Sequence, residues 1–125
     1  MITLQFTNPG TGESQTVGPA SFFRIVGGLL YQRPGGELVA THKNWQWQIG
    51  GASFKMIQSL GRTLVEFEDD GAHRYGPAAF VTIVDGGLWF GHEHSKLVAK
   101  LDEAKNTWRV FESNQLCLTI TLLAG

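Results

Sequence analysis

Residues 18–28 have the sequence GPASFFRIVGG, and residues 76–86 have the sequence GPAAFVTIVDG. Seven of these eleven positions are identical when 58 is added to the first number. In both stretches Gly-Pro-Ala precedes a short apolar run that ends at glycine, a pattern typical of a strand between turns. We predict that each proline stands at the first residue of its strand, where the missing N–H costs little.

The likeness between the two stretches continues outward in the same order along the chain. Trp47 aligns with Trp108 and Tyr31 with Trp89, and length differences fall only at expected turns, where chains tolerate them. We therefore predict an internal duplication, with one repeat over residues 2–60 and the other over residues 62–124. Only the last strand of each unit aligns poorly.

Apolar residues alternate with polar residues almost everywhere outside the turns. The run from Leu116 to Leu122 is an example, with leucine or isoleucine at every second position. Such alternation predicts strands that bury one face and expose the other. The fold class expected is all-β, with about twelve short, mostly antiparallel strands. We expect one domain over residues 1–125, a barrel or a sandwich with pseudo-twofold symmetry in which the two repeats share a core.

Composition excludes several classes of partner. The formal net charge is −1, and the ten lysines and arginines are scattered singly along the chain, which argues against a nucleic-acid or membrane surface. No apolar stretch is long enough to cross a membrane as a helix, and the first residues do not resemble a signal peptide. We expect a cytoplasmic protein.

The sequence Gly91-His92-Glu93-His94 is the main candidate for a metal site. Two histidines at i and i+2 on a strand point to the same side and can share a metal ion. The spacing is similar to the start of the cupin motif, but the residues from Lys96 to Ala99 lack the glutamate that motif requires. His92 and His94 also align with a hairpin tip. A His-dependent metal enzyme is therefore the least favoured hypothesis, and we expect no cofactor.

The aromatic residues are the better candidates for a binding site. Trp47 and Trp108 share the alternation face of buried aliphatic residues, so we assign both to the core. Exposed aromatic rings usually mark ligand or partner contacts. The candidate ligand-binding residues are Tyr75, Trp89, Trp45 and Tyr31.

The sequence contains no nucleophile elbow, phosphate-binding loop or zinc-binding cysteine pattern, which favours a role other than catalysis. The leading hypothesis is a non-enzymatic binding or interaction module that associates with itself or with an unidentified protein or small ligand. The alternative is a small-ligand or carbohydrate-binding β-domain. A specific ligand is expected on the second repeat, near Tyr75, Trp89 and His92, because polar and aromatic groups concentrate there.

Overall fold

A computed structural model describes residues 1–33, 36–68, 71–91 and 95–125, and these residues form sixteen β-strands and no helix. The strands of the first half are β1 (Ile2–Thr7), β2 (Ser14–Ala20), β3 (Phe22–Val26), β4 (Leu29–Arg33), β5 (Glu37–Lys43), β6 (Gln46–Ile49), β7 (Ala52–Phe54) and β8 (Met56–Leu60). Those of the second half are β9 (Thr63–Glu68), β10 (Ala72–Ala78), β11 (Val81–Val84), β12 (Gly87–Phe90), β13 (Lys96–Asp102), β14 (Thr107–Val110), β15 (Gln115–Cys117) and β16 (Thr119–Ala124). In the part of the chain so described, no helix is available that could span a membrane.

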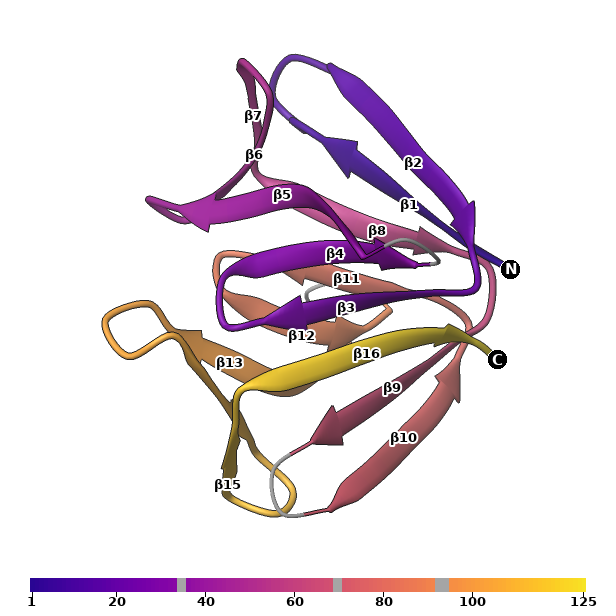
Figure 1. The fold of residues 1–125 in the computed structure, drawn as a ribbon, viewed down its shortest axis with the longest axis vertical. Helices are drawn as coiled ribbons and strands as arrows, with labels where there is room; N and C mark the ends of the chain where they lie inside the picture. Colours follow the sequence, from indigo (N-terminus) through magenta and orange to yellow (C-terminus); the bar gives the residue numbers. More distant parts are fainter. Residues whose placement is uncertain (34–35, 69–70, 92–94) are drawn as a thin grey trace.

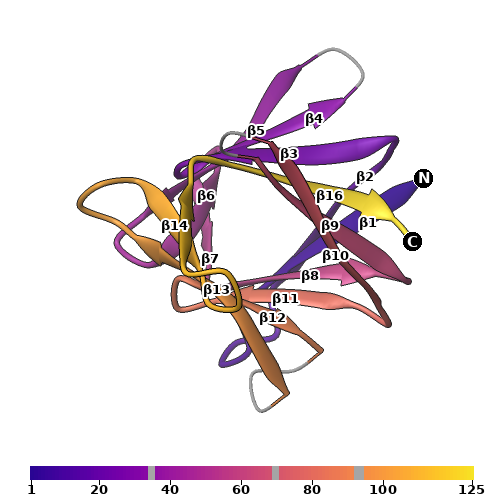
Figure 2. The same ribbon diagram turned by 90° about the horizontal axis from the view of Figure 1, so that it is seen from below.

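The strands form a sandwich of two antiparallel sheets (Figures 1 and 2). Sheet A has the order β15-β14-β13-β12-β11-β8-β1-β2, and sheet B has the order β10-β9-β16-β3-β4-β5-β6-β7. Each sheet therefore combines five consecutive strands of one half with three strands of the other. The strand count exceeds the expected dozen partly because β2 and β10 are exposed edge strands without the apolar alternation that predicts a strand.

One hydrophobic core lies between the two sheets. It contains residues of both halves, and its largest fully buried side chains include Trp47, Trp108, Phe6 and Phe23. The assignment of Trp47 and Trp108 to the core is confirmed by exposed fractions of 1% and 0%. The alternation of buried and half-buried residues along β1 and β9 follows from strands that face this core on one side only.

The Gly-Pro-Ala sequences do not begin strands, contrary to the prediction. Pro19 and Pro77 lie near the ends of β2 and β10, each after a cis peptide bond. β2 and β10 are edge strands, and their pairing is irregular where the prolines lie. A proline is tolerated at such a place because its missing N–H has no ladder partner to satisfy.

The run from Leu116 to Leu122 is not a single strand with all four aliphatic residues on one face. It divides at Leu118, where the chain passes from β15 in sheet A to β16 in sheet B. Leu116 and Leu118 are 59% and 50% exposed, whereas Cys117, Ile120 and Leu122 are buried. The expected face was wrong for the first two leucines because the change of sheet reverses which side of the chain faces the core.

A small polar network lies where the two halves meet. The buried Ser59 on β8 accepts a hydrogen bond from the Val81 N–H of β11 at 2.8 Å. Its hydroxyl also lies 2.7 Å from the buried hydroxyl of Thr63, which is 2.9 Å from the Gly61 carbonyl oxygen. If Ser59 donates to Thr63 and Thr63 to Gly61, each buried hydroxyl is satisfied, as burial of polar groups requires.

Candidate functional site

The turn between β5 and β6 places a bulky aromatic residue where glycine is favoured. Asn44 and Trp45 have φ angles of 55° and 63°, the pattern of a type I′ hairpin turn. Asn-Gly is the preferred sequence for that turn, because a side chain in the left-handed region costs about 1–2 kcal/mol. Trp45 nevertheless occupies the second position and is 44% exposed. The turn is thus less stable than an Asn-Gly turn would be, and it presents an indole ring to solvent.

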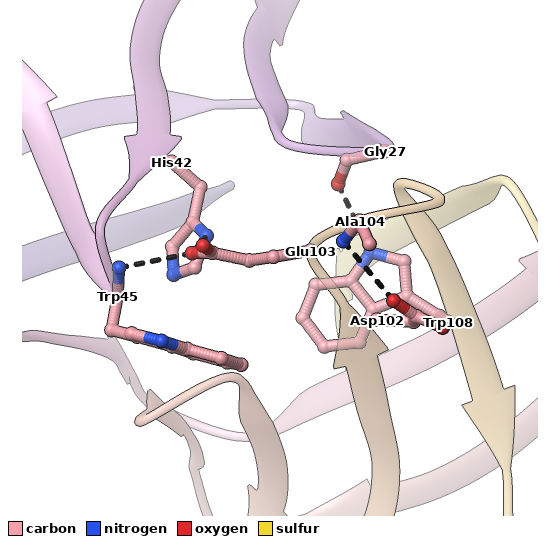
Figure 3. Close-up of polar contacts among 7 residues, drawn as sticks. All are labelled: Gly27, His42, Trp45, Asp102, Glu103, Ala104 and Trp108. Atoms are coloured by element: carbon pink, nitrogen blue, oxygen red, sulfur yellow. Dashed lines mark hydrogen bonds and ion pairs between the residues drawn. The ribbon is translucent and has the colours of Figure 1, made fainter.

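Contacts from the second half hold Trp45 in this conformation (Figure 3). The backbone N–H of Trp45 donates a hydrogen bond to the Glu103 carboxylate at 2.9 Å. The indole packs on Gly86, where a β-carbon would overlap the ring. Gly86 has a φ of 73° and belongs to the β11–β12 hairpin, so a turn of sheet A receives the ring from a turn of sheet B. The Trp45 side chain is therefore positioned before any ligand arrives.

Glu103 also contacts a buried histidine. Its Oε2 lies 2.9 Å from Nδ1 of His42, whose side chain is only 2% exposed. The contact lacks the direction of a hydrogen bond and leaves Nδ1 without a hydrogen-bond partner, so we regard it as electrostatic. Burial lowers the pKa of His42 below its usual value, and the opposing effect of Glu103 is smaller. His42 is therefore neutral at pH 7, and its ring packs edge-on against Trp45 with centroids 6.0 Å apart.

A groove of about 600 Å³ lies beside Trp45. Lys100 of β13 and Arg109 of β14 contribute to its lining and are directly opposite each other in the sheet. The other lining residues are Trp45, Leu101, Asp102, Glu103, Ala104, Thr107 and Leu116. The groove therefore combines an exposed aromatic ring with charged groups of both signs and an exposed leucine.

A smaller hollow of about 150 Å³ adjoins the groove through Lys100, which lines both. Trp89 lines this hollow, and its indole nitrogen would lie 2.8 Å from a β-carbon at Gly87. Trp45 packs on Gly86, and Trp89 packs on Gly87. Two consecutive glycines of the β11–β12 hairpin therefore each contact an indole ring.

The corresponding turns of the two halves differ in length, so the groove is not reproduced at the equivalent place. Two residues, 44 and 45, connect β5 to β6, whereas four residues, 103–106, connect β13 to β14. The longer turn supplies Glu103. Asn106, which aligns with Trp45, is also left-handed with a φ of 53° and packs near Gly27. Trp108 beside it donates from its indole nitrogen to the Gly27 carbonyl at 3.1 Å (Figure 3).

The four candidate aromatic residues are not brought together. Trp45 and Trp89 adjoin the groove and its hollow, but Tyr31 lies on β4 and Tyr75 on β10, both in sheet B. Tyr75 is half-buried, and the centroid of its ring lies 5.4 Å from the centroid of the Phe67 ring. Tyr75 and Trp89 belong to different sheets, and the ligand site expected near Tyr75, Trp89 and His92 stays a prediction.

His92 and His94 lie outside the described residues, so the metal hypothesis stays a prediction. Within the described ranges, no group of three or more His, Cys, Asp or Glu residues could hold a metal ion.

Sequence reasoning missed His42, Lys100, Glu103 and Arg109. For Lys100 and Arg109 the signal was that the second half carries a charge where the aligned position of the first half does not, whereas His42 lies in the first half and Glu103 lies in the longer turn. The chain matches no protein-family model, and no curated protein or solved structure is significantly similar to it.

Proposed function

We propose that this protein is a non-enzymatic binding module whose ligand site is the groove beside Trp45. The observation that carries the proposal is the exposed, left-handed Trp45, held from the other sheet by Glu103 and Gly86. Backbone strain of this kind persists where surrounding contacts enforce it, and it concentrates at functional sites. Tryptophan is also one of the residues enriched among the side chains that contribute most of the binding energy at interfaces.

The groove has the size and composition of a ligand site. Small-molecule sites commonly span about 300–1,000 Å³ and combine apolar walls with a few polar groups that orient the ligand. The groove beside Trp45 is about 600 Å³ and offers Thr107, Lys100 and Arg109 next to Leu116. These side chains project from strands of one sheet, so their positions need little reorganisation on binding.

We also propose that the two halves arose by duplication and fold only together. In support, each sheet contains strands of both halves, and the core draws on both. A duplicated chain offers an internal control, because positions that differ between halves are not dictated by the fold. The groove consists largely of such positions, among them Trp45, Lys100 and Arg109.

The proposal is tested by a ligand screen with paired variants. Thermal unfolding of the protein is measured against a library of soluble saccharides and small polar molecules, with wild type, Trp45→Ala and Tyr31→Ala in parallel. We expect at least one compound to raise the unfolding temperature of wild type and Tyr31→Ala but not that of Trp45→Ala. Compounds that stabilise all three proteins equally would show that binding occurs elsewhere.

A second candidate function, self-association, is favoured by the two exposed leucines at the edge of sheet A. By the registers of β6 with β7 and of β14 with β15, Leu116 and Leu118 take the positions that Ser53 and Lys55 have in the first half. There, Asn8 covers the corresponding corner, donating to the Ser53 carbonyl at 2.7 Å and accepting from the Lys55 N–H at 3.0 Å. An exposed apolar pair on an edge strand is a common contact between subunits.

Sedimentation velocity of wild type and of the Leu116→Ser/Leu118→Lys double variant tests this candidate. We expect the wild type to form a dimer or larger species and the variant, which restores the residues of the first half, to be monomeric. A monomeric wild type at high micromolar concentration would remove self-association while leaving the groove proposal intact.

A further inference from the structure

Two cations face each other in the proposed groove. Lys100 on β13 and Arg109 on β14 are directly opposed in an antiparallel pair, and both side chains are exposed. Like charges at opposed positions destabilise a sheet. Among the residues that the structure describes, neither cation forms an ion pair with a carboxylate. Arg109 instead lies over the ring of Phe111, with 5.1 Å between the guanidinium carbon and the ring centroid.

The carboxylates of Asp102 and Glu103, which line the groove, have hydrogen-bond partners elsewhere, and a third carboxylate, that of Asp85, lines the adjoining hollow with Lys100. Asp102 accepts from the backbone N–H of Ala104 at 3.1 Å, within its own turn. Glu103 accepts from the Trp45 N–H at 2.9 Å and lies beside His42. Among the described residues, no carboxylate is therefore paired with Lys100 or Arg109, and both cations can contact a ligand that enters the groove.

The fold does not require this pair of cations. The aligned positions of the first half are Thr41 and Gln48, which are also directly opposed but carry no charge. The same architecture is thus built once with a neutral pair and once with two cations. A charge pair that weakens its own sheet and is not needed for the fold indicates a role in binding an anion.

The surroundings of the cations limit the kind of anion. β13 is paired with β12 and β14, and β14 with β13 and β15, so the backbone at Lys100 and Arg109 is already committed to the sheet. A peptide could not add a strand there, which is the usual source of affinity for an extended peptide. Recognition must use side chains, and Trp45 on the groove and Trp89 in the adjoining hollow are flat apolar surfaces.

We infer that the groove binds oligosaccharides that contain uronic acid residues, an inference that rests on the proposed function. A uronate carries its carboxylate on a pyranose ring whose C–H face is flat and apolar. The carboxylate would lie between Lys100 and Arg109. The two parallel N–H donors of the Arg109 guanidinium match the spacing of the two carboxylate oxygens. The sugar face would stack on Trp45, as apolar surfaces do on indole rings.

Isothermal titration calorimetry at low ionic strength tests the inference with a matched pair of ligands. Hexagalacturonate and its fully methyl-esterified form share one backbone and differ in charge. A hyaluronan hexasaccharide serves as a second uronate probe. The test variant is Lys100→Thr/Arg109→Gln, which places amino acids found in the neutral pair of the first half. The control is Lys96→Gln, which removes an exposed cation from the same strand outside the groove.

We expect wild type and Lys96→Gln to bind at least one uronate probe with dissociation constants within twofold of each other. The double variant should bind at least tenfold more weakly, and so should wild type toward the methyl ester. The inference is overturned if neither uronate probe binds at millimolar concentration, if the ester binds equally well, or if polyglutamate binds while the uronates do not.

Trp45→Ala separates this inference from the proposed function. Ester binding that depends on Trp45 but not on the cations would refute the charge argument and leave the binding groove standing. Uronate binding that is lost in the double variant but unchanged in Trp45→Ala would contradict the proposed role of Trp45. It would keep only the anion site.

Discussion

Replacement of Trp45 by glycine and by alanine should reveal the backbone strain of the β5–β6 turn. Both changes remove the same indole contacts with Gly86 and His42, so their difference reports the backbone alone. A β-carbon at the φ of 63° costs about 1–2 kcal/mol in the folded state. Glycine loses about 0.5–1 kcal/mol more than alanine through the entropy of the unfolded chain. We therefore expect Trp45→Gly to be more stable than Trp45→Ala by about 0.75 kcal/mol, the difference between the midpoints of these two ranges.

Urea denaturation measures the two free energies of unfolding, with the fluorescence of the buried Trp47 and Trp108 as the signal. The control pair is Leu116→Gly and Leu116→Ala, at an exposed strand position outside the left-handed residues. There the order should reverse, with glycine the less stable by about 0.5–1 kcal/mol. Equal stability of the two Trp45 variants, or a more stable alanine, would refute the claim that this turn is strained.

Two further predictions concern buried polar groups. Ser59→Ala leaves the buried Val81 N–H without its acceptor and should lower the free energy of unfolding by about 1–3 kcal/mol. The control Ser53→Ala, at an exposed position, should change it by less than about 0.5 kcal/mol. Equal effects of the two substitutions in urea denaturation would contradict the assigned network. For His42, burial lowers the pKa in the folded state, so the unfolded chain binds the proton first as the pH falls. Wild type should therefore lose stability relative to His42→Gln as the pH drops below about 6.5, and parallel stability curves for the two proteins would contradict the dominance of burial over Glu103.

The all-β class follows directly from local sequence, because alternation and turn residues are local signals. Ile2, Leu4 and Phe6 face the core as their period of two predicts. The change of sheet at Leu118 could not be predicted in the same way. It depends on which strands β16 pairs with, and one of its two partners, β3, lies almost a hundred residues earlier in the chain. Alternation specifies two faces of a strand but not which sheet receives it.

The site was predictable only in part, for a similar reason. The sequence predicts Trp45 and Trp89 as two of four candidate ligand-binding aromatic residues. The Glu103 contacts with His42 and Trp45 join residues about sixty positions apart and arise only when the two sheets pack together. Lys100 and Arg109 become a pair through the register of β13 and β14. A comparison of the two halves would have singled them out, because the residues aligned with them, Thr41 and Gln48, carry no charge.

The most direct test of the account is the location of bound ligand by NMR. The ¹⁵N-labelled protein is titrated with hexagalacturonate and, separately, with its methyl ester. We predict that the largest shift changes fall on the Trp45 indole N–H and on the amides of Lys100 and Arg109, with little change at Thr41 and Gln48. Largest changes at Tyr31 or Tyr75 in sheet B, or no changes with either ligand, would contradict the claim that this groove is the binding site.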